Sequence, residues 1–228
     1  MKLGDVHSTL VSALRGGRGW FTQRPGARPL EPLEIYEFEA CPFCRKVRET
    51  LSELDLVYVA RTAARGSAKR EAVKARGGKA LFPYLVDPNT GAAMYESEDI
   101  IDYLHQHYGH GRPRPFRWLS PLNTASAALA SLSRPRGRHV RRPRAEQPPQ
   151  LLELYNFEAS PYCRKVRETL AELDLDYLVR SVAKKSARRP ELVARGGKMM
   201  VPYLIDPNTG TELYESDDIV SYLEATYG

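Results

Sequence analysis

Apolar and polar residues alternate over residues 33–38, which is the period-two pattern of a strand with one covered face. Directly after it, Val47, Leu51 and Leu54 recur at helical spacing. Residues 56–60 are again rich in β-branched and aromatic side chains and predict a second strand. Because the connection between these strands is one short helix, we expect the strands to be parallel with a right-handed crossover.

The pattern then predicts a helix, a hairpin and a further helix. A short polar helix over residues 67–75 ends at Gly77-Gly78. Residues 81–86 form an apolar run interrupted by proline, and residues 92–95 form another. The segment between them, residues 87–91, reads Asp-Pro-Asn-Thr-Gly, which is turn chemistry. We therefore expect an antiparallel hairpin.

The last predicted helix follows Ser97, which can cap its N-terminus. Its apolar residues Ile100, Ile101, Leu104 and Tyr108 share one face. The complete order is β-α-β-α-β-β-α. This pattern favours a compact α/β unit with a mixed sheet.

The same unit occurs twice. Residues 33–109 and 152–228 align without a gap at an offset of 119, with 47 of 77 positions identical. The chain is therefore a tandem duplication. We expect an extension with a short helix, a first domain, an arginine-rich linker with a short helix, and a second domain, at residues 1–32, 33–109, 110–150 and 151–228 respectively.

The formal net charge is +6, but it is concentrated outside the two copies. The segments in chain order carry +3, −2, +8 and −3. Arginines in the linker can meet nucleic acid or an anionic lipid surface, yet only Phe116 and Trp118 are interleaved with them as aromatic residues. We expect a solvated linker and no nucleic-acid partner.

Three cysteines in 228 residues exclude a secreted disulfide scaffold, and no apolar run reaches the roughly 18 residues of a membrane span. We expect a cytoplasmic protein without a transmembrane segment. The arginines of the first 30 residues also suit an organelle transit peptide. However, Leu10, Ser12, Arg15 and Pro29 recur 119 residues later, which favours a short helix before each copy, near residues 6–14 and 125–132.

Candidate chemistry lies in Cys41-Pro42-Phe43-Cys44, between the first strand and the first helix. A helix start favours a thiolate because its backbone N–H groups and dipole are positive. Pro42 suits the first helical turn. Two cysteines at this spacing predict redox chemistry, with Cys41 as the exposed nucleophile and Cys44 as the resolving thiol. Half of a zinc site or two buried cysteines are the alternatives; no metal ligand set is expected.

In its element order and motifs, each copy resembles the thioredoxin fold, and more narrowly a glutaredoxin or the N-terminal domain of a glutathione transferase. The motifs are CPFC, Phe82-Pro83, and Tyr95-Glu96-Ser97 before a helix. The fold class implied is α/β with two tandem thioredoxin-like domains, each a four-stranded mixed sheet with flanking helices. The resemblance covers both copies and neither connector.

The resemblance implies glutathione as cofactor. Phe82 and a cis Pro83 would offer a peptide-docking edge, as would Val201 and Pro202 in the second copy. Glu96, Ser97, Glu215 and Ser216 would hold the γ-glutamyl end of glutathione, where each helix start can accept a carboxylate. Four basic residues are candidates for its other carboxylate: Arg76, Lys79, Arg195 and Lys198.

The second copy reads Ser160-Pro161-Tyr162-Cys163, so it cannot run a two-thiol cycle. In the family to which it is similar, a serine here activates bound glutathione, so Ser160 is a catalytic candidate. Alternatively, this copy keeps only the fold and a vestigial pocket and covers one face of the first copy. Cys163 would then be a structural thiol, or a third redox partner if the halves face each other.

Three functions follow as hypotheses. The first is a glutathione-dependent thiol-disulfide oxidoreductase that acts on glutathionylated or disulfide substrates. The second is a glutathione transferase, although such enzymes usually carry an all-helical second domain where this chain has another copy. The third is a non-catalytic glutathione-binding module, or a homodimer that shares an iron–sulfur cluster through Cys41.

Overall fold

The computed structural model describes residues 19–22, 26–110 and 136–228. The short helices expected near residues 6–14 and 125–132 lie outside these ranges. The first half contains β1 (Leu33–Glu37), α2 (Pro42–Glu53), β2 (Val57–Thr62), α3 (Lys69–Gly77), β3 (Tyr84–Asp87), β4 (Ala92–Met94) and α4 (Ser97–Tyr108). The second half repeats it with β5 (Leu152–Asn156), α6 (Pro161–Glu172), β6 (Tyr177–Ser181), α7 (Arg189–Gly196), β7 (Tyr203–Asp206), β8 (Thr211–Leu213) and α8 (Ser216–Tyr227).

The predicted elements form for the reasons that the pattern gives. Burial alternates along β1, and β2 runs parallel to it after the α2 crossover. The helix α3 ends where Gly78 adopts φ +84°, a conformation that costs glycine little. β3 and β4 pair antiparallel around the predicted turn. β3 begins only at Tyr84, so the run predicted from residue 81 is shorter as a strand.

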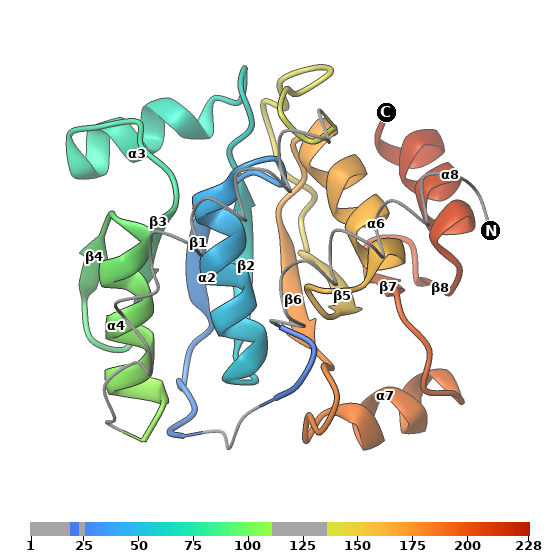
Figure 1. Ribbon diagram of the computed structural model, residues 1–228. Helices are drawn as coiled ribbons and strands as arrows, with labels where there is room; N and C mark the ends of the chain where they lie inside the picture. The colour runs from blue at the N-terminus through green and yellow to red at the C-terminus, as the bar shows by residue number, and fades with distance from the viewer. Residues whose placement is uncertain (1–18, 23–25, 111–135) are drawn as a thin grey trace.

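The two halves join into one sheet of eight strands in the order β4-β3-β1-β2-β6-β5-β7-β8 (Figure 1). The junction is an antiparallel pairing of β2 with β6, in which Val59 lies opposite Leu178. These two residues are equivalent in the repeat, so the halves are related by an approximate two-fold axis through the pair. Each half thereby covers the β2 or β6 edge that the other would expose.

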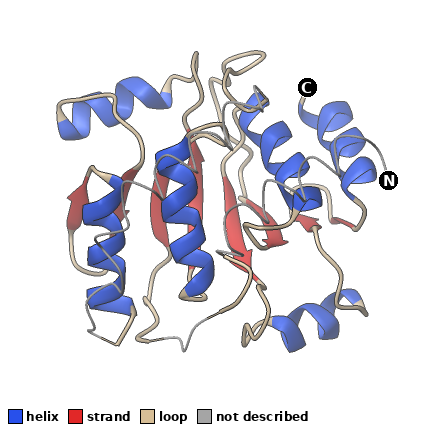
Figure 2. Ribbon diagram, viewed as in Figure 1, coloured by secondary structure: helices blue, strands red, loops and turns tan. Residues whose placement is uncertain are grey.

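Four helices, α2, α4, α6 and α8, pack on one face of the sheet, whereas α3 and α7 lie at opposite ends of it (Figures 1 and 2). One apolar cluster under the four helices includes Leu33, Ile35 and Leu85 of the first half and Leu152 and Leu204 of the second. The two copies therefore share a core, as their modest individual size suggested.

Short segments that precede each copy also cross to the other half. Phe21 forms a parallel bridge with Lys184, and His139 forms the equivalent bridge with Arg65. Gly19 N–H donates to Glu53, and Gly137 N–H donates to the corresponding Glu172. The connectors thus repeat structurally as well as the domains.

The linker was expected to be solvated, and most of its described residues are exposed or half-buried, but several of its arginines also bind the second half. Arg136 and Arg141 both form ion pairs with Glu172, and Arg141 also reaches Glu224. Arg144 donates to the carbonyl oxygens of Leu173 and Tyr227. These arginines hold the linker against α6 and α8.

Candidate functional site

Cys41 is the N-cap of α2, at the end of the loop that follows β1. Its backbone is extended, with φ −79° and ψ 120°, and Pro42 occupies the first turn as predicted. The backbone N–H of Cys44 donates to Cys41 Sγ at 3.2 Å. The expectation that Cys41 is exposed is wrong, because only 3% of the residue is accessible. The loop and the Phe82-Pro83 segment pack around it.

The two thiols have different acidities for physical reasons. Burial opposes the thiolate of Cys41, but hydrogen bonds from the thiol and backbone N–H of Cys44, together with the charge of Arg48, outweigh it and lower the Cys41 pKa. Burial, the hydrogen bond to Cys41 and the nearby charges of Cys41 and Glu37 raise the Cys44 pKa well above its ordinary value. The first cysteine is therefore the one suited to ionise.

Both predicted cis peptide bonds are present, at Phe82-Pro83 and at Val201-Pro202. In its protonated form the Cys41 thiol points at the Phe82 carbonyl oxygen, 3.9 Å away. The guanidinium of Arg70, on α3, lies 4.5 Å from the centre of the Phe82 ring. The structure thus brings the thiol, the proline segment and a cation together.

The start of α4 differs from the prediction in one detail. Glu96, not Ser97, is the N-cap residue, and Ser97 is the first residue of the helix. Glu96 has φ +63°, and Glu215 has φ +62° at the start of α8. A non-glycine residue at positive φ is costly, and such conformations cluster at ligand sites. Sequence patterns gave no signal for it.

The second half repeats this geometry without the first thiol. Ser160 is the N-cap of α6, and its Oγ accepts the Cys163 N–H at 3.2 Å. Cys163 is fully buried, and burial raises its pKa. Because β1 and β5 run antiparallel in the joined sheet, the starts of α2 and α6 lie at opposite ends of it (Figure 1). Cys163 therefore does not face Cys41, and the structure gives it no redox partner role.

The four basic residues named for a carboxylate divide between the halves. Arg195 forms an ion pair with Glu212, 2.8 Å apart, and Lys198 lies over the Tyr214 ring. At the equivalent positions, Arg76 and Lys79 have no ion pair within the described residues, because Ala93 replaces the glutamate. Arg76 is therefore available to a ligand carboxylate, whereas its counterpart Arg195 is paired with Glu212.

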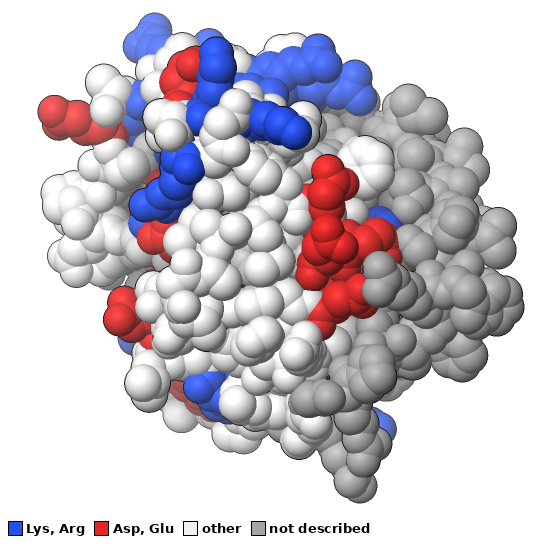
Figure 3. All heavy atoms as spheres, turned by 90° about the vertical axis from the view of Figure 1, so that its left-hand side faces the viewer, with Lys and Arg blue, Asp and Glu red and all other residues white. Residues whose placement is uncertain are grey.

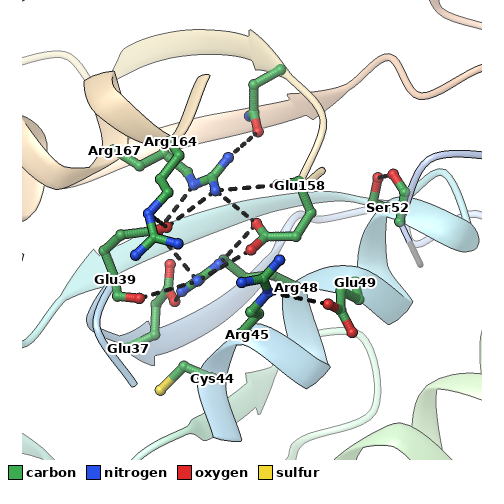
Figure 4. A network of polar contacts seen from close by, with 12 residues as sticks. Glu37, Glu39, Cys44, Arg45, Arg48, Glu49, Ser52, Glu158, Arg164 and Arg167 are labelled. Atoms are coloured by element: carbon green, nitrogen blue, oxygen red, sulfur yellow. Dashed lines mark hydrogen bonds and ion pairs between the residues drawn. The ribbon is translucent and has the colours of Figure 1, made fainter. Parts of the chain in front are cut away.

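Sequence reasoning missed a buried polar cluster between the halves (Figure 4). The guanidinium of Arg48, on α2, donates to both carboxylate oxygens of Glu158, with N–O distances of 3.0 and 3.3 Å. The guanidinium of Arg167, on α6, donates to both carboxylate oxygens of Glu39, with N–O distances of 3.0 and 3.1 Å. Each arginine thus binds the glutamate that follows the first strand of the other half. The repeat did contain a signal for this cluster, because the arginine and the glutamate of one copy recur in the other at the offset of 119.

The two halves of this cluster differ at the position that ends the first strand. Glu37 at the end of β1 pairs with Arg48, whereas the second half has Asn156 at that position, which binds Arg167. Burial raises the Glu37 pKa against the charge of Arg48. Burial also opposes ionisation of Glu39, but the charges of Arg167 and Arg48 prevail and lower its pKa to about 2. We therefore treat Glu39 as ionised at neutral pH.

Two further findings concern the described residues alone. No helix among them is long and apolar enough to cross a membrane. No group of three or more His, Cys, Asp or Glu side chains among them is placed to hold a metal ion.

Comparisons with known proteins agree with this architecture. The family model described as the glutathione S-transferase N-terminal domain matches residues 35–114 and again 154–228, together more than half of the chain. The glutathione S-transferase-like protein tpcF of Aspergillus fumigatus is 37% identical over 70 residues. That segment spans 31% of this chain and 31% of the relative.

A solved structure, the trimeric glutathione transferase TDR1 of Leishmania, covers 86% of this chain and 68% of its own at 15% identity. Its TM-score is 0.30, and at that score the likeness adds nothing on fold or function. The two family matches, together with the repeated thioredoxin-like fold, are sufficient. The chain belongs to the glutathione S-transferase N-terminal domain family and carries two copies of that domain in one continuous sheet.

Proposed function

We propose that this protein is a glutathione-dependent thiol-disulfide oxidoreductase in which Cys41 is the nucleophile and Cys44 the resolving thiol. One observation carries the proposal: Cys41 Sγ lies at the start of α2, accepts the Cys44 N–H at 3.2 Å, and has a lowered pKa. A thiolate at neutral pH is the species that attacks a disulfide. The transferase alternative gives no reason for a second cysteine at position 44.

The proposed reaction has two thiol–disulfide exchange steps, one for each cysteine. The Cys41 thiolate attacks one sulfur of a substrate disulfide, forms a bond to it and releases the other sulfur as a thiolate. Cys44, whose pKa is raised, stays protonated during this step. It then loses its proton and attacks Cys41 Sγ, which breaks the bond between Cys41 and the substrate sulfur, releases that sulfur as a thiol and leaves a Cys41–Cys44 disulfide. Glutathione supplies the thiol that resolves or reduces the resulting disulfide when bound.

Glutathione fits the residues at the start of α4. Glu96 is held at φ +63° and is followed by Ser97, so the first-turn N–H groups and a hydroxyl are available to a carboxylate. Ser97 would hold the γ-glutamyl carboxylate and Glu96 the amine beside it. Phe82 would pair with the peptide backbone. Arg76 and Lys79 would meet the glycyl carboxylate.

The second half has a structural role in this proposal and a degenerate redox site. Its Ser160 leaves no nucleophilic thiol at the helix start, and Cys163 is buried with a raised pKa. Glu215 keeps the strained backbone of a glutathione site, so a second glutathione at Ser216 and Val201-Pro202 is a subsidiary prediction. The domain boundaries near residues 33, 110 and 151, a cytoplasmic location and a homodimer also remain predictions.

The test is glutathione-coupled reduction of a glutathionylated peptide by the wild type and by Cys41→Ser. We expect the reaction to vanish in Cys41→Ser and to persist, through a second glutathione, in Cys44→Ser. Equal rates in the wild type and Cys41→Ser would contradict the proposal. Ser160→Ala is the matched control, because it removes the equivalent N-cap side chain of the other half.

A transferase is the second candidate, favoured by the family match and by the Ser160 hydroxyl at a helix start. It predicts conjugation of an electrophile that survives Cys41→Ser and is lost in Ser160→Ala. Visible absorbance of the purified protein would instead favour the cluster-sharing module.

A further inference from the structure

The segment of residues 65–79, whose Arg70 lies over the Phe82 ring next to Cys41, carries several cations that no carboxylate of the described residues neutralises. Residues 65–79 contain six Lys or Arg and one Glu. Of these cations, Lys69 is committed to Asp174 and Asp176. The other five form no ion pair within the described residues: Arg65, Arg70, Lys74, Arg76 and Lys79. We call these five residues the α3 cation surface. Figure 3 shows Lys and Arg gathered over the α3 end of this face, with Asp and Glu groups mainly below.

The second half is an internal control for this surface. The counterpart of Lys74 is Val193, which is 42% exposed. The counterpart of Arg76 is Arg195, which Glu212 neutralises. The half that lost the nucleophilic thiol has therefore also lost free positive charge at these two positions. Residues 184–198 also contain six Lys or Arg and one Glu, so the difference in free charge between the halves is centred on the positions of Lys74 and Arg76.

Geometry ties the surface to the thiol. Arg70 donates to the Ala63 carbonyl at 2.9 Å, which holds its guanidinium over the Phe82 ring. The Phe82 carbonyl lies 3.9 Å from Cys41 Sγ. An anionic group bound at Arg70 would thus be separated from the Cys41 sulfur by the side chain and the peptide group of Phe82.

Apolar side chains complete the surroundings and indicate the kind of partner. Phe43, two residues after Cys41, and Leu81, which precedes Phe82, are 45% and 49% exposed. A peptide can pair its backbone near Phe82 and cover these side chains, whereas a nucleic acid would need a ladder of stacking aromatic residues. Cys41 itself is 3% exposed, so only an extended segment can bring a disulfide to it.

Resting on the proposed function, we propose that the substrate of Cys41 is a glutathionylated or disulfide-bonded polypeptide with acidic residues flanking its cysteine, docked on the α3 cation surface. The cations attract the acidic flank, and Phe43 and Leu81 contact the residues next to the cysteine. Cys41 then attacks the disulfide, forms a bond to one sulfur and releases the other as a thiolate, so that electrons balance without a further reactant.

The test compares two glutathionylated peptides of equal length, one with acidic and one with basic flanks, at low and moderate salt. For the wild type we expect the acidic peptide to have a kcat/KM about tenfold higher at low salt, and the advantage to shrink with salt. Lys74→Val, which copies the second half, and Lys74→Glu should reduce this advantage through KM, with kcat unchanged. Val193→Glu, at the exposed position of the other half that corresponds to Lys74, is the matched control and should leave this advantage intact.

Binding is measured separately so that the two proposals can fail independently. A fluorescent acidic peptide without a disulfide is titrated onto Cys41→Ser, where no reaction occurs, and anisotropy should report binding that Lys74→Glu weakens. Equal kcat/KM for both peptides, or equal effects of Lys74→Glu and Val193→Glu, would overturn the docking proposal. So would tighter binding of an oligonucleotide than of the acidic peptide. Absence of reduction with either peptide, with binding retained, would overturn the proposed function alone.

Discussion

Replacing Arg167 with methionine removes one cation from the buried cluster between the halves. The side chain of Arg167 is 1% exposed. Methionine replaces the aliphatic part of this side chain and lacks the charged guanidinium. Without it, Glu39 loses two hydrogen bonds, at 3.0 and 3.1 Å, and Glu158 loses an ion pair at 3.1 Å. Arg48 is then left to neutralise Glu37 and Glu158, and shares Glu39 with Arg164, whose Nε lies 3.9 Å from it.

The expected cost follows from leaving charge buried and unpaired. Removal of one partner from a buried ion pair destabilises a protein by about 3–5 kcal/mol. For 228 residues the entropy of unfolding is about 0.5 kcal/mol/K, so the melting temperature should fall by about 6–10 °C. Because the cluster joins the halves, the loss should appear in one cooperative transition.

The measurement is urea and thermal unfolding of Arg167→Met, Glu39→Gln and the double variant at pH 7. In the double variant one unpaired carboxylate is gone, so we expect it to be less destabilised than the sum of the single variants, by about 1–3 kcal/mol. Arg195→Met removes an arginine from the exposed pair with Glu212 and should cost less than about 1 kcal/mol. Equal costs for Arg167→Met and Arg195→Met, or strict additivity, would refute the reasoning.

The pH dependence has a definite sign. The Glu39 pKa is lowered to about 2 in the folded protein, so the ionised form contributes stability at pH values above about 4.5. That contribution is lost as the pH falls toward 2. The stability difference between the wild type and Arg167→Met should therefore narrow below pH 4.5, and a constant difference would contradict it.

Three further predictions concern single sites. The pH midpoint for alkylation of Cys41, followed by mass spectrometry, should lie below the free-cysteine value of about 8.5 and rise in Arg48→Met, because the Arg48 charge stabilises the thiolate. Glu96→Gly should be more stable than Glu96→Ala by about 1 kcal/mol in urea unfolding, because φ is +63°, and both should weaken glutathione binding by calorimetry. Asp87→Asn should lose about 1.5–3 kcal/mol at pH 7, because Asp87 accepts hydrogen bonds from two tyrosine hydroxyls of α4 at 2.6 and 2.5 Å.

Each of these has an outcome that contradicts it. A Cys41 midpoint above 8.5 would remove the thiolate at neutral pH. Equal stability of the glycine and alanine variants at position 96 would mean that the backbone there carries no strain. Burial opposes ionisation of Asp87, but hydrogen bonds outweigh burial and lower the Asp87 pKa. The contribution of Asp87 to stability is therefore present above the ordinary carboxyl pKa and is lost as pH falls. A gap between wild type and Asp87→Asn that widens in acid would disagree with that sign.

Local pattern was sufficient for the secondary-structure elements within each copy. The strand of residues 33–37 follows from alternation, the start of α2 from Pro42, and the hairpin from its turn residues. The burial of Ile100 and Leu104 follows from helical spacing. Errors were small and concerned ends, such as the cap of α4, because a residue at positive φ has no sequence signature when it is glutamate.

Pattern failed wherever a residue depends on the other half. Arg48 follows the site motif, and no sequence pattern singled it out as a buried residue, since arginine is rarely buried. It is buried because Glu158, 110 residues away, provides a partner. The exposure of Cys41 was also wrong, although its cover comes from the same half: the helix start is exposed in an isolated α2, but the Phe82-Pro83 segment, 41 residues further along the chain, packs on it.

The amino-acid sequence by itself determined the duplication, the order of elements in each copy, the thiol at a helix start and its loss in the second copy. These depend on periodicity, turn chemistry and residue identity, which are local. Only the tertiary structure decided that the copies pair through β2 and β6, that two arginines exchange glutamates across the junction, and that the two helix starts lie at opposite ends of the sheet. These are long-range contacts, and a β edge or an arginine acquires its partner only when both halves have folded.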